Sequence, residues 1–465
     1  MKITVIGCGH LGAVHAACMA ELGHDVLGVE IDQDKVSLLN SGKGWFHEPG
    51  LDEMLARNVE AGRVRFTTSF AEAAGFGSVH FLGVATPGQP DGSYDLAQVH
   101  AAVSSLARHA RQPCLIVGKS TVPPGTAESL RALATDISPS GYVDVAWNPE
   151  FLREGCAIAD TLMPDRIVIG CTSDSAADVL RDIYRPLTDS GTPLMVTDLA
   201  TAELVKCAAN SFLAAKISFI NAIADICFAV GADICSLADA LGMDPRIGRS
   251  FLSAGIGYGG ACLPKDVRGL ASFAQQAGTH TASDLLMLVD AINTGRRDRV
   301  VQIVRQLAVG MPMAGRASLA HPLTGRRIAV WGGAFKPGTD DVRDSPGLDI
   351  ARRLHLAGAE VKVYDPMANG NAFIASPELS YANSAADAAS DSELLVIVTP
   401  WPEFAAMNPV TLASDVANMT VVDACQGIDL MKWQEAGWKV RSLTEEHTES
   451  AGESAGESAA MAAGT

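Results

Sequence analysis

The segment 2–32 limits the possible folds of this chain more than any other part of it. It reads KITVIGCGHLGAVHAACMAELGHDVLGVEID, an apolar β-branched run followed by a glycine-rich turn, an alanine-rich helical pattern and a second apolar run that ends at Glu30. The turn glycines are Gly7, Gly9 and Gly12. Glycines at this spacing allow a tight turn, a close approach of the backbone to a pyrophosphate and close packing of helix on strand. The segment therefore predicts a unit that holds a dinucleotide at a helix N-terminus.

Glu30 indicates which dinucleotide is bound. It follows the glycines by about 20 residues, which is where a carboxylate binds the ribose 2′-hydroxyl in such units. A carboxylate at this place would repel the 2′-phosphate of NADP, so the pattern favours NAD as the cofactor. Asp32 could share the role if the strand continues that far.

Strand and helix patterns alternate through the first 200 residues. Further strand-like runs lie at Val79–Val84, Cys114–Gly118, Val143–Ala146, Ile167–Gly170 and Leu194–Val196. Such an alternation predicts a parallel sheet with helices on both faces. Polar motifs follow three of these runs: ATP at 85–87, KSTVPPGT at 119–126 and NPEFLREG at 148–155. Because ligands bind at the carboxyl ends of the strands in such sheets, we expect these loops to converge on the nicotinamide half of the site.

The proline-free segment 201–231 has a long helical periodicity. Lys206 and Asn210 are four residues apart, so they share one helical face and can reach the same ligand. A helix of this length, rich in small and apolar residues, is suited to join two domains and to form a dimer interface. Taken alone, Lys206 could equally be a surface lysine whose stem covers apolar residues.

A second α/β unit begins near Thr324. Its strand-like runs are Arg327–Trp331, Glu360–Tyr364, Leu394–Val398 and Thr420–Asp423, and the segment after Ser345 is helical in pattern. The predicted fold class is therefore α/β, with two Rossmann-like doubly wound parallel-sheet domains joined by a long central helix and a helical domain. We expect the domains at 1–200, 201–300 and 318–440, a connecting loop at 310–322, and a disordered acidic tail at 441–465.

Charge and composition exclude several classes of protein. The net charge of −18 argues against nucleic-acid binding, which needs a basic surface. No apolar run reaches the roughly 20 residues of a membrane span, and the chain enters a strand at once, so we expect neither a membrane segment nor secretion. The ten cysteines lack paired spacing, which favours reduced thiols in the cytoplasm and no metal site.

The run GIGYGGACLPKD at 255–266 is typical of a loop that presents a nucleophile. Its four glycines precede Cys262, and Lys265 and Asp266 follow closely. Glycine lets a ligand approach the backbone, and a neighbouring ammonium lowers the pKa of a thiol. A covalent step on the sulfur is one interpretation. The alternative is that Cys262 is an apolar filler, as most free cysteines are.

Nine segments, taken together and in order, resemble the UDP-glucose/GDP-mannose dehydrogenase family over residues 1–440. They are VIGCGHLG, GVATP, GKSTVPPGT, NPEFLREG, TAELVKCAANSFLAAKISFIN, DPRIG, GYGGACLPKD, AFKPGTDDVRDSP and TPWPEF. The resemblance implies oxidation of a nucleotide-activated hexose, with UDP-glucose favoured, from the C6 alcohol to the carboxylate by two NAD+ in turn. It also implies that Cys262 attacks the C6 aldehyde, because an aldehyde can lose a hydride only after a nucleophile has added.

The resemblance assigns roles to further residues. The implied catalytic residues are Cys262, Lys206, Asn210, Asp266, Thr121 and Glu150. The implied cofactor-binding residues are Gly7, Gly9, Gly12, Glu30, Thr86, Thr121, Glu154, Lys265 and Arg343. The implied substrate-binding residues are Glu150, Phe151, Leu152, Lys206, Asn210, Arg246, Tyr258, Gly259 and Lys336. Arg246 resembles an arginine that reaches the partner's substrate in family dimers, so a homodimer is expected.

The chain departs from the family pattern at three positions. Cys425 stands where an arginine usually approaches the nucleotide diphosphate, Pro400 where a glutamate is common, and His10 where a tyrosine is common. Losing a charge-assisted contact to phosphate costs about 1.5–3 kcal/mol, so dTDP-glucose or another nucleotide hexose is an alternative substrate. A two-electron β-hydroxyacid-type dehydrogenase and a binding-only sensor are further alternatives. The base of the first step stays open.

Overall fold

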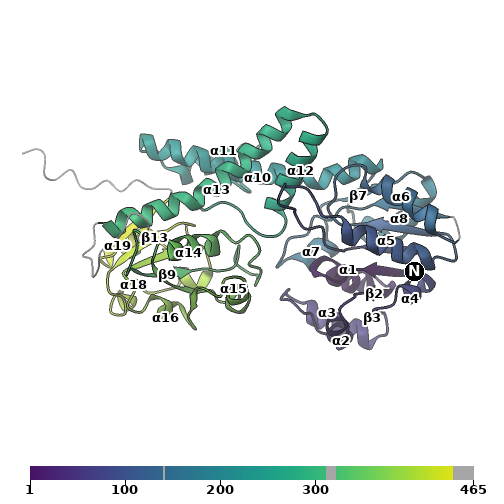
Figure 1. Ribbon diagram of the computed structural model, residues 1–465, viewed down its shortest axis with the longest axis horizontal. Coiled ribbons are helices and arrows are strands. Elements are labelled where there is room, and N and C mark those ends of the chain that lie inside the picture. Colours follow the sequence, from purple (N-terminus) through teal and green to yellow (C-terminus); the bar gives the residue numbers. More distant parts are fainter. Residues whose placement is uncertain (140–141, 310–320, 444–465) are drawn as a thin grey trace, which may run out of the picture.

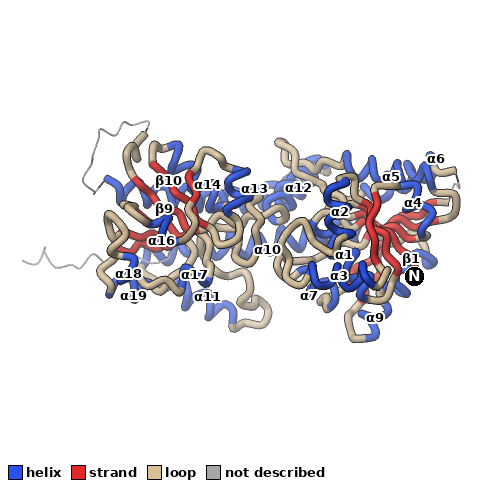
Figure 2. The backbone as a smooth tube through the Cα atoms, turned by 90° about the horizontal axis from the view of Figure 1, so that it is seen from below, coloured by secondary structure: helices blue, strands red, loops and turns tan. Residues whose placement is uncertain are grey.

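The computed structural model describes residues 1–139, 142–309 and 321–443. Two sheet domains lie at opposite ends of the molecule, and a group of long helices, α10 to α13, runs between them (Figure 1). A view at right angles shows the same two groups of strands far apart (Figure 2). The first domain begins at the N-terminus and the second follows the long helices.

The first sheet has eight strands in the order β3-β2-β1-β4-β5-β6-β7-β8. They are β1 Lys2–Ile6, β2 Asp25–Val29, β3 Val64–Thr67, β4 Val79–Leu82, β5 Cys114–Gly118, β6 Val143–Trp147, β7 Ile167–Gly170 and β8 Leu194–Thr197. Neighbouring strands are parallel except β6 and β7, which pair antiparallel through Trp147 and Gly170. The order of the first six strands is that of a dinucleotide-binding sheet, and it confirms the predicted doubly wound fold.

Helices cover both faces of this sheet. They are α1 His10–Glu21, α2 Gln33–Asn40, α3 Leu51–Glu60, α4 Phe70–Phe76, α5 Ala97–His109, α6 Thr126–Ile137, α7 Ala157–Leu162, α8 Asp174–Ile183 and α9 Arg185–Asp189. Buried apolar side chains of α1, α3 and α8 fill one core, and those of α4, α5 and α6 fill the other. Burial on both faces explains why the strands read as continuous apolar runs in the sequence.

The middle of the chain is helical, with α10 Leu199–Val230, α11 Ile234–Gly242, α12 Leu263–Gln276 and α13 His280–Val309. Asp198 caps α10, and Gly231 ends it in the left-handed conformation. By length and hydropathy α10 could cross a membrane, contrary to the expectation from the sequence that no segment could. However, Glu203, Lys206 and Asn210 are buried polar side chains on this helix, and α10 packs on α12, α13 and β7. One face of α10 is therefore packed inside this fold, and other side chains of the helix are exposed.

The second sheet has six parallel strands in the order β11-β10-β9-β12-β13-β14. They are β9 Arg327–Trp331, β10 Glu360–Tyr364, β11 Ser380–Tyr381, β12 Leu394–Ile397, β13 Thr420–Asp423 and β14 Lys439–Ser442. The helices are α14 Pro346–Leu356, α15 Asn369–Ala375, α16 Ala385–Ala389, α17 Pro402–Ala405, α18 Pro409–Leu412 and α19 Leu430–Glu435. Side chains of α13 and α14 fill the core on one face, and those of α16, α17 and α19 fill the other.

Some elements differ from the sequence prediction. The predicted end of the helical domain, residue 300, lies inside α13, which continues to Val309. Residues 441 and 442 belong to β14, so the first part of the predicted tail is ordered strand. The remainder of that tail, from residue 444 on, and most of the predicted connecting loop lie outside the described residues.

Candidate active site

The glycine-rich turn lies between β1 and α1, and its packing requires glycine. Gly7 has a φ of +85°, and a Cβ on Gly12 would lie 1.8 Å from the carbonyl oxygen of Gly7. Glu30 follows β2, and its carboxylate accepts a hydrogen bond from the Cys8 N–H at 3.1 Å. Asp32 instead caps α2 by accepting from the backbone of Asp34. The turn and Glu30 thus form the cradle that an NAD pyrophosphate and ribose require.

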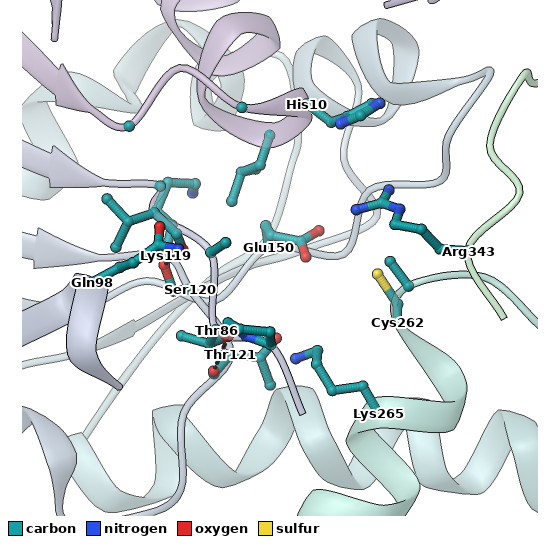
Figure 3. A pocket seen from close by; sticks show the side chains of 18 of the residues that line it. His10, Thr86, Gln98, Lys119, Ser120, Thr121, Glu150, Cys262, Lys265 and Arg343 are labelled. Atoms are coloured by element: carbon teal, nitrogen blue, oxygen red, sulfur yellow. Dashed lines mark hydrogen bonds between the residues drawn. The ribbon is translucent and has the colours of Figure 1, made fainter. Parts of the chain in front are cut away.

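A single cavity of about 1190 Å³ extends from this turn to Cys262. The sequence-predicted residues that line it are Gly7, Gly9, Glu30, Thr86, Thr121, Glu150, Leu152, Glu154, Cys262, Lys265 and Arg343. The side chains of Glu150, in the loop after β6, and of Cys262, just before α12, face the same space (Figure 3). The loops after β4, β5 and β6 therefore meet at one edge of the sheet, as their place after strands predicts.

Cys262 stands immediately before α12. The preceding glycines bring the loop close to the second domain, because a Cβ on Gly259 would lie 2.4 Å from the Asp344 carbonyl oxygen. The thiol is accessible through the cavity but has protein on its other sides. Burial raises the pKa of the Cys262 thiol to about 11, and the Lys206 ammonium opposes this more than Lys265 does. The expectation that a neighbouring lysine lowers this pKa below the ordinary value is wrong for this state, because desolvation outweighs both ammonium groups.

Two buried polar pairs lie beside Cys262. The Lys206 ammonium is 3.0 Å from the Glu150 carboxylate. Burial acts to lower the pKa of Lys206, but Glu150 and the other neighbouring acidic groups outweigh it and raise the pKa above its ordinary value. Asn210 donates a 2.6 Å hydrogen bond to Asp266, and the Lys265 ammonium lies 2.8 Å from the other oxygen of Asp266. Lys206 is therefore a buried cation and not a surface lysine.

Along its length the chain matches the models of three domains of one known family. They are the NAD binding domain of the UDP-glucose/GDP-mannose dehydrogenase family over residues 1–188, its central domain over 200–295 and its UDP binding domain over 329–429. UDP-glucose 6-dehydrogenase of Rhizobium meliloti is 41% identical over 91% of this chain and 94% of its own length. The chain belongs to the UDP-glucose/GDP-mannose dehydrogenase family.

Two solved structures of the family show the same fold. A UDP-glucose dehydrogenase from Pyrobaculum islandicum is 36% identical, with a TM-score of 0.86 over 96% of this chain and 98% of that one. A UDP-D-ManNAc dehydrogenase from Pyrococcus horikoshii is 25% identical, with a TM-score of 0.82 over 96% and 99%. The resemblance stated from the sequence is therefore confirmed, and NAD is the cofactor of this family's first domain.

A charged contact joins the NAD binding domain to the UDP binding domain over the cavity. Arg343 donates to the carboxylates of Glu154 and Asp341, both at 3.0 Å or less. The Lys336 ammonium donates to the backbone oxygen of Glu154 at 2.7 Å. Burial and the neighbouring Asp341 raise the pKa of Glu154 to about 7, while Arg343 opposes the shift. Lys336 thus lies at the domain junction and does not line the cavity.

Several sequence-predicted residues do not line this cavity. Gly12, Phe151, Lys206, Asn210, Tyr258, Gly259 and Asp266 lie behind it or beside it. The Tyr258 ring packs in an apolar cluster with α12 and α13. Arg246 does not line the cavity either, and its side chain is 87% exposed and pairs with Asp244.

Lys119 and His10 are among the cavity residues that were not assigned a role from the sequence. Lys119 is buried, donates to the Asn148 side chain at 2.9 Å, and has its pKa lowered to about 8 by burial. The sequence feature that could have identified Lys119 is its place in the motif KSTVPPGT, directly after a strand. His10 packs on the rings of Trp45 and Phe46 beside the glycine turn. Among the described residues no group of three or more acidic, cysteine or histidine side chains could hold a metal ion.

Proposed function

We propose that this protein oxidises UDP-glucose at C6 to the uronic acid, with Cys262 as the covalent nucleophile. The observation that carries the proposal is the thiol at the far end of a cavity that begins at the NAD-binding turn, with a buried lysine and a buried aspartate beside it. The similarity to named UDP-glucose 6-dehydrogenases over nine-tenths of the chain supports this substrate.

Each residue beside Cys262 has a separate role in the proposed oxidation. When bound, NAD+ accepts one hydride from C6 in each of two oxidations. After the first, the Cys262 sulfur adds to the aldehyde carbon, and the Lys206 ammonium stabilises the oxyanion that forms there. We assign Asn210, whose amide donates to Asp266 in the protein without ligands, to the same oxygen. Loss of the second hydride leaves a thioester, which water cleaves to release the carboxylate and restore the thiol.

The residues around Asp266 suit the hydrolytic step. Its carboxylate is fully buried and is shared between Asn210 and Lys265, so it is held in one orientation. Thr121 lines the cavity. We assign these two side chains to the positioning of the attacking water. Glu150, which is paired with Lys206, and Lys119 are the candidates for the base of the first oxidation, and the proposal holds with either.

The identity of the substrate's nucleotide is tested by comparing the rates with several nucleotide sugars. Cys425, at the position of the usual arginine, has its thiol 3.7 Å from Asp423, so this position supplies no cation to a diphosphate. The protein is incubated with NAD+ and UDP-glucose, dTDP-glucose, GDP-mannose or UDP-N-acetylmannosamine, and NADH absorbance is followed. We expect UDP-glucose to react fastest and to give two NADH per sugar. One NADH per sugar, without uronic acid, would instead support the two-electron dehydrogenase.

We propose further that the active unit is a homodimer in the cytoplasm. Large apolar side chains are exposed on α10 and α13, namely Phe212, Phe219, Ile226, Leu285, Met287 and Leu288. Exposed apolar surface of this kind is typical of protein interfaces. The buried thiols of Cys8, Cys18, Cys207 and Cys227 form no disulfide, which suits a reducing compartment. Light scattering at several concentrations should give the mass of two chains.

A further inference from the structure

Gly269 occupies an unexpected place in the helix that follows Cys262. It is buried in the middle of α12, where glycine is the poorest helix former apart from proline. A Cβ at this position would lie 2.2 Å from Cζ of Tyr94 and 2.5 Å from its hydroxyl oxygen. The Tyr94 ring therefore fills the space that any other residue at position 269 would need.

Tyr94 is presented by a short hairpin of the NAD binding domain. Residues 88 and 94 form an antiparallel bridge, and the Gln89 N–H donates to the Ser93 carbonyl oxygen at 2.7 Å. The Gln89 side chain also donates to the carbonyl oxygen of Tyr94 at 3.3 Å. The hairpin follows the ATP motif after β4, and Gly88, Gln89 and Gly92 line the cavity. The hairpin thus joins the cavity wall to Tyr94.

The hairpin lies along α12 at successive residues. A Cβ on Gly88 would be 3.6 Å from Cγ of Lys265, and one on Gly92 would be 3.3 Å from the carbonyl oxygen of Arg268. The Tyr94 hydroxyl lies 3.5 Å from the carbonyl oxygen of Asp266. The first turns of α12, which carry Lys265 and Asp266, therefore rest on the cofactor domain through this hairpin.

The Tyr94 ring also fixes a charged side chain. The Lys265 ammonium lies 4.7 Å from the centre of this ring and 2.8 Å from the Asp266 carboxylate. An ammonium over an aromatic face is attracted by the ring's quadrupole, and more so when both groups are desolvated. Tyr94 is 7% exposed, so the ring is available to Lys265 but hardly to water.

We propose that Tyr94 is a positioning residue of the active site, which holds the Lys265 ammonium against Asp266 and sets α12 at the distance that places Cys262 in the cavity. This inference rests on the proposed function of Cys262 and Asp266. Gly269 is the complementary residue, because it leaves room for the ring. Neither Tyr94 nor Gly269 need touch the substrate.

Five variants, Tyr94→Ala among them, test the proposal through kinetics. Tyr94→Phe keeps the ring and should retain nearly full kcat. Tyr94→Leu keeps an apolar side chain without an aromatic face and should lose about tenfold in kcat, the ratio expected for a desolvated cation–π contact. The KM for the sugar nucleotide should change little. Gly269→Ala should also lower kcat, because the new Cβ displaces the ring. In Gly269→Ala/Tyr94→Ala the added methyl group should cost nothing beyond the effect of Tyr94→Ala.

A second readout does not depend on turnover. Without substrate, the rate at which iodoacetamide alkylates Cys262 is measured by mass spectrometry at fixed pH, and it follows the thiolate fraction. The charged groups that face the thiol are Lys206, Glu150, Asp266, Lys265 and Arg343. Release of Lys265 from Asp266 leaves more negative charge beside the sulfur, so Tyr94→Leu should be alkylated more slowly than Tyr94→Phe. This comparison holds even if UDP-glucose is not the substrate.

Two outcomes would overturn the proposal. One is a folded Tyr94→Leu protein, checked by thermal unfolding, with the kcat and alkylation rate of the wild type. The other is a Gly269→Ala defect that persists in full when Tyr94 is alanine, since the methyl group would then act on the helix itself. If Tyr94→Ala does not fold, Tyr94→Leu and Gly269→Ala/Tyr94→Leu replace it in the comparison.

Discussion

The Lys206 ammonium lies 3.0 Å from the Glu150 carboxylate, and both side chains are largely buried. Lys206 belongs to α10 of the central domain and Glu150 to the loop after β6 of the NAD binding domain. The pair therefore connects the long helix to the cofactor domain at the level of Cys262. A buried ion pair also keeps the ammonium charged, which is the form that can stabilise an oxyanion.

Replacing this cation should slow the reaction and loosen the fold. Lys206→Met should lower kcat by about 10²–10³-fold, as loss of an oxyanion-stabilising donor does in other enzymes. It should also reduce thermal stability, because Glu150 is left buried without its partner. Lys362→Met is a suitable control, since Lys362 is an exposed lysine of the UDP binding domain that contacts only the Asp387 carboxylate at 3.7 Å and the Asp387 carbonyl oxygen at 3.2 Å among the described residues. A Lys206→Met enzyme that kept nearly wild-type kcat would contradict the assigned role.

Cys262→Ser should abolish acid formation, because the alkoxide of serine is a much poorer leaving group than a thiolate and its hydroxyl is hardly ionised at neutral pH. Uronic acid is measured by chromatography alongside NADH. Cys114→Ser is the matched control, since Cys114 is the first residue of β5 and so lies at the edge of the sheet opposite the cavity. Full acid formation by Cys262→Ser would exclude the thioester and revive the alternative functions.

Most of the fold could be predicted from the sequence because its strands are buried on both faces. The predicted and observed bounds of Cys114–Gly118, Arg327–Trp331 and Glu360–Tyr364 coincide. The strands β3, β11 and β14 were not predicted, because they are short or alternate with polar residues and so lack a continuous apolar run. Most of α13 lies in the predicted helical domain, but its bounds were not predicted, since its polar residues weaken the apolar stripe.

The site was predictable where a motif follows a strand and not where distant residues meet. Position after a strand predicted that the loops with Thr121 and Glu150 meet at one cavity, whereas the place of Cys262 in that site was implied by the family resemblance. The contact of Glu154 with Arg343, which are 189 residues apart, depends on how the two sheet domains pack and leaves no local pattern. The pKa of Cys262 was also misjudged, because the sequence shows the neighbouring lysines but not the burial that outweighs them.

The pH dependence of thiol reactivity follows from this burial. With a pKa raised to about 11, Cys262 is a neutral thiol at pH 7 in the protein without ligands. Its alkylation rate should therefore rise about tenfold per pH unit between pH 7 and 9 without levelling, because the thiolate fraction does so below the pKa. Removing the Lys206 cation should raise the pKa further and slow alkylation at each pH. A plateau near pH 8 would show that the thiol is already activated in the free protein.

Arg246 provides a test of whether each active site needs two subunits. Its side chain is exposed and pairs only with Asp244, so its own chain does not bring it to the cavity. We expect Arg246→Ala and Cys262→Ser homodimers to be inactive. A hybrid dimer of the two variants, isolated with two affinity tags, should recover about half of the wild-type activity, since one site then combines an intact Cys262 with the partner's intact arginine. Arg249→Ala, which removes an exposed arginine paired with Asp239, should stay active. An inactive hybrid, with a wild-type/Cys262→Ser hybrid still active, would show that Arg246 does not complete the partner's site.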